Sequence, residues 1–205
     1  MHGTLAITRR TSPIFEKGLD GSQDGPIMIK IDTTEDLRYP IGQFDKSMID
    51  RARRAEYLQV IADAPKKLSD AIEGLDETQI ETQYRPGGWT IRQVIHHLGE
   101  AHLNGFYRIK MTLTEDSPTI VPYDAGKWAE LGDQTLTIDP SLKIFEGVHS
   151  RLSAILQDLS DAQFERKAIN LESGEWTVEG FLALYAWHAR HHTAHITNLR
   201  QRNNW

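Results

Sequence analysis

The chain has 205 residues, of which 39% are hydrophobic and 25% are charged, and its formal net charge is −6. It contains no cysteine, which excludes disulfides, zinc thiolate sites and a cysteine nucleophile. The acidic balance argues against nucleic acid as a partner, and the lack of a long apolar run argues against a membrane span or secretory signal. We therefore expect a cytoplasmic protein.

The domain organisation is expected to be simple. Residues 1–28 are rich in Gly, Ser, Asp and Pro without sustained periodicity, which predicts a loosely ordered extension. Residues 29–205 are enough for one sizeable hydrophobic core and too few for two. We expect them to form a single domain.

The first helical pattern runs from about Met48 to Gly74, where small and aliphatic residues recur every three or four positions. Pro65 interrupts this pattern. Because proline lacks the amide donor that a helix interior uses, we predict that Pro65 opens a second helical piece at its first turn.

The clearest helix is predicted from Thr90 to about Thr114. Thr90 and Gln93 form a capping-box pattern, and a Pro-Gly-Gly turn precedes them. Residues 115–138 contain two prolines and two glycines, which predicts a long connection with one helical turn near 127–131. Connections of this length in a compact domain are often functional.

Two further long helices complete the pattern. One follows the Asp139-Pro140 pair and continues to about Leu159, and the other follows Trp176-Thr177, which repeats the Trp-Thr opening of the helix at Thr90. No segment shows a convincing strand alternation. Four long helices predict an all-α four-helix bundle, a fold whose cofactor sites are built from inward side chains on facing helices.

Four of the nine histidines lie in the stretch HARHHTAHI, residues 188–196. On a helix, His188, His192 and His195 fall within roughly 60° of one another, with His191 at the edge of that arc. A tag or a solvated polar face would also explain a histidine-rich stretch. The apolar residues around it favour a buried helix, and histidines four residues apart can reach one metal ion.

A second group of histidines lies in the helix that starts at Thr90: His96, His97 and His102. Two helices that are expected to pack together therefore hold seven of the nine imidazoles, which favours a metal site over the alternatives. His96 and His97 point about 100° apart, so only one of them can face a given partner helix. Periodicity modestly favours His97, and we expect His102 to be partly exposed or hydrogen-bonded near the mouth of the site.

Four segments together carry a family resemblance: LRYPIGQF, YRPGGWTIRQVIHHLGEAHLN, LTEDSPTIVPYDAGKWAEL and YAWHARHHTAHI. In this order, over about residues 36–202, the chain resembles the YfiT-like metal-dependent hydrolases of the DinB superfamily. The resemblance implies a four-helix bundle, often a homodimer, with a metal held by His97, His188 and His192. His195 stands where many members have Gln, so the resemblance places it in the pocket and not on the metal.

Three neutral imidazoles leave a divalent ion, zinc or nickel, with its full charge and at least one open coordination position. Such an ion lowers the pKa of bound water to about 7. One divalent ion per chain then predicts a hydrolase acting on a small molecule. Two alternatives stay open: an S-transferase that uses bacillithiol or another low-molecular-weight thiol, as some relatives do, and a noncatalytic metal-binding bundle.

Several other residues are candidates for accessory roles. Glu100 follows His97 by three residues and could act as a general base, or it could be an exposed helix carboxylate. Trp89 could line the pocket or anchor the core. His149 is expected at the surface or hydrogen-bonded, His191 is expected to be peripheral, and Arg190 is expected at the surface. The remaining pocket candidates are Tyr84, Arg85 and His96, and Glu115 and Asp116 could approach the site from the long connection.

Overall fold

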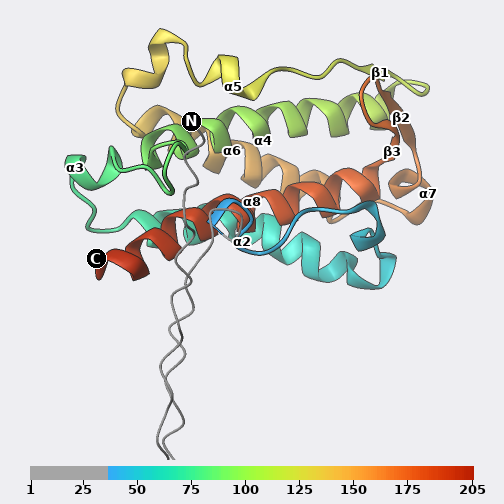
Figure 1. The fold of residues 1–205 in the computed structure, drawn as a ribbon. Coiled ribbons are helices and arrows are strands. Elements are labelled where there is room, and N and C mark those ends of the chain that lie inside the picture. Colours follow the sequence, from blue (N-terminus) through green and yellow to red (C-terminus); the bar gives the residue numbers. More distant parts are fainter. Residues whose placement is uncertain (1–36) are drawn as a thin grey trace, which may run out of the picture. The chain divides into compact units, whose positions relative to one another are not determined.

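A computed structural model describes residues 37–205 of the chain. Four long helices form a bundle (Figure 1): α2 (Arg54–Ile72), α4 (Ile91–Thr114), α6 (Asp139–Leu156) and α8 (Val178–Asn203). Helix α2 packs against α8 and α6, and α4 packs against the same two helices. The predicted all-α four-helix bundle is confirmed, as is the long connection between its second and third helices. The predicted extension, residues 1–28, lies outside the described residues.

The two helices that carry most of the histidines begin at threonine caps. The Thr90 side chain accepts a hydrogen bond from the Gln93 amide, and the Gln93 side chain accepts one from the Thr90 amide, which completes the predicted capping box. Thr177 caps α8 by accepting from the amide of Gly180. These caps satisfy free amides at both helix starts and set which residues face the core.

Helix α2 departs from the prediction in two ways. It starts at Arg54 and not near Met48, because two short 3-10 turns come first, η1 (Lys46–Met48) and η2 (Arg51–Arg53), each capped by an aspartate side chain. Pro65 lies inside α2, so the prediction that it opens a separate helical piece was wrong. A proline at this position leaves the carbonyl of Ile61 without its helical amide partner, and Nδ1 of His149 donates to that carbonyl instead.

Three short strands were missed by the prediction of an all-helical chain: β1 (Thr119–Ile120), β2 (Lys167–Asn170) and β3 (Gly174–Thr177). Strand β1 pairs parallel with β2, and β2 pairs antiparallel with β3, at one end of the bundle (Figure 1). Each has four residues or fewer, too few for a recognisable alternation. Trp176 therefore lies in β3 and not in the opening of α8.

The connections contain shorter helical turns. Helix α6 ends at Leu156 and not near Leu159, and the predicted turn in the long connection is α5, slightly earlier than expected. The short turns are α3 (Glu77–Ile80), α5 (Ala125–Trp128), η3 (Gly132–Thr135) and α7 (Asp161–Phe164). No helix within residues 37–205 combines the length and apolar character needed to cross a membrane.

The inner faces of the four long helices form the hydrophobic core. On α4, five aliphatic side chains are completely buried: Ile91, Val94, Ile95, Leu98 and Ile109. They follow the helical repeat and place His97 on an inward face next to them. The core thus holds α4 and α8 close enough for their histidines to meet.

Candidate metal centre

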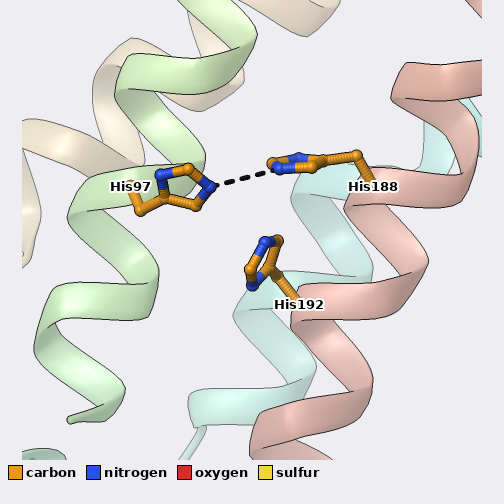
Figure 2. A group of neighbouring side chains, drawn as sticks. All are labelled: His97, His188 and His192. Atoms are coloured by element: carbon orange, nitrogen blue, oxygen red, sulfur yellow. Dashed lines mark hydrogen bonds between the residues drawn. The ribbon is translucent and has the colours of Figure 1, made fainter. Parts of the chain in front are cut away.

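Three histidines meet between α4 and α8. His97 comes from α4, and His188 and His192 come from consecutive turns of α8 (Figure 2). One nitrogen from each ring lies within 4.8 Å of the others, and Nε2 of His97 is 3.2 Å from Nε2 of His188. The structure therefore brings together the three residues that were predicted as metal ligands.

The spacing of the two α8 histidines explains why both reach this point. Residues four apart on a helix lie on one face, and the ring centroids of His188 and His192 are 4.5 Å apart. His97 faces them across the helix interface, with ring centroids at 5.1 Å from His188 and 4.8 Å from His192. The group is thus assembled by one contact within α8 and two contacts between α4 and α8.

The three imidazoles are held in the neutral form that binds metals. Burial lowers the pKa of His97 to about 4 and lowers the pKa of His188 and His192 well below the ordinary value of 6.5. Repulsion from a neighbouring imidazole in its protonated form would lower these pKa values further. At neutral pH each ring therefore keeps a lone pair, and a divalent cation could bind without first displacing protons.

The donor set fits a divalent ion. Ligand nitrogens around a tetrahedral zinc are about 3.3 Å apart, close to the 3.2 Å between Nε2 of His97 and Nε2 of His188. Nδ1 of His192 is buried without a hydrogen-bond partner among residues 37–205. Buried polar atoms are rarely left unpaired, which marks this group as a place where a ligand or ion is expected.

Aromatic rings lie beside the histidines, and Trp89 lies nearest to the three-histidine group. Its ring centroid is 4.8 Å from that of His97 and 6.4 Å from that of His192. Tyr84 stacks on His195 with centroids 3.9 Å apart, and Nε of Arg85 donates to the Tyr84 hydroxyl at 3.1 Å. Trp89 thus contacts the three-histidine group directly, whereas Tyr84 and Arg85 reach it through His195.

His195 belongs to a second, adjoining group with His191 and His192. Nε2 of His195 donates to the carbonyl of Arg38 at 3.0 Å, and the residue is not part of the group that contains His97. His191 was expected to be peripheral, but it is 5% exposed and stacks on Trp187 with centroids 4.4 Å apart. The edge of the histidine arc is covered by protein, so His191 is buried as well.

Two candidates on α4 lie beside the group without joining it. Nδ1 of His96 is 2.7 Å from Oγ of Ser141, so this ring turns toward α6, as its offset of about 100° from His97 requires. Glu100 is half-buried and accepts a hydrogen bond from the Gln134 side chain at 3.0 Å. Burial raises the pKa of Glu100, and the negative charge of Asp133 adds to this effect.

Three charged candidates lie away from the histidines. Glu115 and Asp116 follow the end of α4, about 27 Å along the helix axis from His97, so they do not approach the group. Arg190 is exposed and pairs with Glu56 at 2.8 Å, which agrees with the expectation of a surface residue.

For two histidines the predicted hydrogen-bonded alternative is confirmed and the exposed alternative is wrong. His102 and His149 are each 1% exposed, so His102 is not partly exposed and His149 does not lie at the surface. Nε2 of His102 is 3.2 Å from Nδ1 of His188, and Nδ1 of His102 is 2.9 Å from Nε2 of His149. Both therefore connect to the three-histidine group through hydrogen bonds. The sequence signal that could have pointed to them is Pro65, which frees the carbonyl that His149 uses.

Fold and histidine geometry together define a helical bundle with a candidate metal centre, and comparisons with known proteins agree. The family model described as the DinB superfamily matches residues 61–196, and the chain belongs to this superfamily. A protein of Bacillus mycoides strain KBAB4 is 46% identical over 177 residues, covering 83% of this chain and 99% of the relative. A protein of Bacillus cereus strain 03BB102 is 48% identical over 171 residues, with the same coverage. Both carry the provisional name of metal-dependent hydrolase.

A solved structure shows the same architecture. YfiT from Bacillus subtilis, described as a probable metal-dependent hydrolase with an unusual four-helix bundle topology, superposes with a TM-score of 0.78 at 41% sequence identity. The match covers 83% of this chain and 99% of YfiT. The predicted resemblance to the YfiT-like proteins is confirmed.

Proposed function

We propose that this protein is a divalent-metal-dependent hydrolase of a small molecule, with one zinc or nickel ion held by His97, His188 and His192. The observation that carries the proposal is the convergence of three neutral imidazoles from two helices, of which His97 and His192 are buried and His188 is half-buried. The names of the Bacillus relatives support the same class of activity.

The ligand set supports a catalytic ion over a structural one. Structural zinc sites use four protein ligands, whereas catalytic sites use three and leave a position for water or substrate. In the described part of the chain, the group around His97 has three members, and His195 is not among them. When bound, a divalent ion would supply Lewis-acid chemistry and lower the pKa of a water molecule.

The protein's own side chains supply orientation and proton transfer in this proposal. Trp89 covers one side of His97 and His192, which excludes water from that side of the group. Glu100 lies one turn after His97 on α4, and burial raises its pKa, a direction that suits a carboxyl that accepts and returns a proton. The Gln134 amide holds one carboxyl oxygen of Glu100 in place.

A thiol S-transferase is the second candidate, and a specific feature favours it. The chain contains no cysteine, so no protein thiolate can compete for the ion. Three neutral imidazoles also leave the ion's charge uncompensated, which would favour binding of an anionic thiolate from a cosubstrate.

The experiment that separates these functions uses zinc-loaded and nickel-loaded protein with a panel of activated esters, amides and alkylating electrophiles. Each electrophile is incubated with and without bacillithiol or glutathione. Hydrolysis without thiol supports the proposed hydrolase, whereas consumption that requires thiol, with a thioether product, would replace it by the S-transferase. If neither occurs while the ion binds at one per chain, the protein is a noncatalytic metal-binding bundle.

A further inference from the structure

Two buried histidines outside the three-histidine group, His102 on α4 and His149 on α6, connect that group to the backbone of α2. The contacts run in one line from the carbonyl of Ile61 to Nδ1 of His149 at 2.6 Å, from Nε2 of His149 to Nδ1 of His102 at 2.9 Å, and from Nε2 of His102 to Nδ1 of His188 at 3.2 Å. All four long helices contribute one residue to this line. A series of imidazoles joined in this way is a single hydrogen-bonded unit.

The direction of every hydrogen bond in this line is set at its α2 end. A backbone carbonyl can only accept, so the proton of His149 must be on Nδ1, and its Nε2 is an acceptor when the ring is neutral. Nδ1 of His102 must then donate to His149, which leaves Nε2 of His102 as an acceptor. By the same reasoning Nδ1 of His188 donates to His102, and the lone pair of His188 is on Nε2.

That lone pair lies where the candidate ion would be held. Nε2 of His188 is the atom that lies 3.2 Å from Nε2 of His97, on the side away from His102. If His188 carried its proton on Nε2 instead, it could not bind an ion at this point. The carbonyl of Ile61 thus determines the tautomer of a residue on another helix through two intervening rings.

Apolar packing keeps the two connecting rings neutral and in place. His102 and His149 are each 1% exposed, and burial without a carboxylate partner disfavours the charged imidazolium. The Phe145 ring lies against both, with centroids 4.8 Å from His102 and 4.1 Å from His149. The centroid of the Tyr185 ring lies 5.2 Å from that of His102.

We propose that His102 and His149 are positioning residues that hold His188 in the Nδ1–H tautomer, with its Nε2 lone pair directed at the metal site. The proposal rests on the metal site of the proposed function. Hydrogen bonds from a metal-binding histidine to a neighbouring acceptor commonly fix ring orientation and tautomer, and losing one typically costs ten- to hundredfold in metal affinity. Here the acceptor is another histidine, and its own tautomer is set by a backbone carbonyl.

The first test measures the tautomers in metal-free wild-type protein at pH 7.5. Long-range ¹H–¹⁵N correlation spectra of ¹⁵N-histidine-labelled protein distinguish Nδ1–H from Nε2–H rings. We expect His149, His102 and His188 all to carry the proton on Nδ1. A predominant Nε2–H form at His188 would overturn the proposal, and this measurement does not depend on whether any variant folds.

The second test compares two variants by zinc titration. His102→Phe keeps a ring of similar size but removes the acceptor, so we expect the zinc Kd to rise about ten- to hundredfold and His188 to show mixed tautomers. His102→Gln supplies an amide oxygen that can accept from His188, so we expect a Kd within about threefold of wild type. Equal Kd values for wild type and His102→Phe would overturn the proposal.

The two tests also separate this proposal from the proposed function. If wild-type protein shows the three Nδ1–H tautomers but binds neither zinc nor nickel, the hydrogen-bonded line is correct and the metal site is wrong. If zinc binds tightly while His188 is in the Nε2–H form, the metal site survives and the positioning role fails.

Discussion

Nδ1 of His149 donates to the carbonyl of Ile61 at 2.6 Å, and this contact joins the middle of α6 to the middle of α2. In a regular helix the carbonyl of Ile61 would accept from the amide of residue 65. That residue is Pro65, which has no amide proton. Pro65 is unfavourable inside a helix, but it leaves the carbonyl of Ile61 free to accept from His149. The orientation of His149, His102 and His188 depends on that carbonyl.

We expect Pro65→Ala to weaken zinc binding although residue 65 lies on a different helix from every candidate ligand. The new amide would bind the carbonyl of Ile61 and turn it toward the α2 axis, so its hydrogen bond to His149 would lengthen. The Nδ1–H proton of His149 should shift upfield in the ¹H spectrum, and the zinc Kd should rise a few fold, less than in His102→Phe.

Ala62→Ser serves as the control, because it changes a neighbouring residue of α2 and keeps both Pro65 and the carbonyl of Ile61. It should leave the His149 proton resonance and the zinc Kd near their wild-type values. A Pro65→Ala protein with an unshifted His149 resonance would show that the proline does not control this contact.

His96 and His97 offer a matched pair for testing the metal ligands. They are neighbours on α4, but His97 faces His188 and His96 lies against Ser141. His97→Ala should lower zinc affinity by more than about a hundredfold, because it removes one of three ligands. His96→Ala should retain one ion per chain, as measured by metal analysis after gel filtration.

The same measurement applies to α8. His188→Ala and His192→Ala should each abolish stoichiometric metal binding. His195→Ala should keep it, because His195 donates a hydrogen bond to the carbonyl of Arg38 and is not part of the group that contains His97. Unchanged stoichiometry in His97→Ala, His188→Ala or His192→Ala would remove that residue from the ligand set.

Most of the fold follows from local signals in the sequence. The caps at Thr90 and Thr177 mark the starts of α4 and α8, and apolar repeats along the chain predict all four long helices. The strands β2 and β3 could not be predicted in this way, because they are four residues each and depend on pairing with each other and with β1. Pro65 misled the prediction because tertiary contacts, including the one from His149, compensate for its missing amide.

The parts of the candidate site that depend on contacts within one helix could be predicted, and those that depend on contacts between helices were harder to predict. The spacing of His188 and His192 is enough to place both on one face of α8. The choice of His97 over His96 depends on which face of α4 is turned toward α8. Periodicity gave only a modest preference for His97. His102 and His149 could not be assigned, since their roles depend on contacts between residues 47 and 86 positions apart along the chain.

Gly105 on α4 and Gly147 on α6 form a second matched pair, this time for packing. A Cβ atom on Gly105 would lie 2.5 Å from Cζ of Tyr185, whereas one on Gly147 would meet nothing within 4 Å. We expect Gly105→Ala to lower the free energy of unfolding by about 1–3 kcal/mol through overpacking. Gly147→Ala should raise it by about 0.5–1 kcal/mol, because alanine loses less backbone entropy than glycine when the helix forms.

Urea denaturation, monitored by circular dichroism, measures the free energy of unfolding of both variants. Because the Tyr185 ring also packs against His102, Gly105→Ala should weaken zinc binding as well, while Gly147→Ala should leave it unchanged. Equal stability of the two variants would show that Tyr185 can move aside without cost.

The buried histidines predict that metal-free protein loses stability between pH 6.5 and 4. Burial lowers the pKa of His149 to about 4, whereas an imidazole in the unfolded chain titrates near 6.5. Between these values the unfolded state binds more protons than the folded state, so acidification favours unfolding. The contribution of His149 is fully present above pH 6.5 and is lost as the pH falls through 4, in total on the order of 3 kcal/mol.

Urea titrations of chelator-treated protein at pH 7.5, 6.5, 5.5 and 5 measure this loss. The hydrogen bond from Arg53 lowers the pKa of Glu56 to about 2, so that ion pair stays intact over this range. His149→Gln removes one titrating group, so the variant should be less stable at pH 7.5 but should show a shallower decline toward pH 5. A wild-type stability that is equal at pH 7.5 and pH 5 would contradict the neutral, buried state of these imidazoles, on which both metal binding and the tautomer of His188 depend.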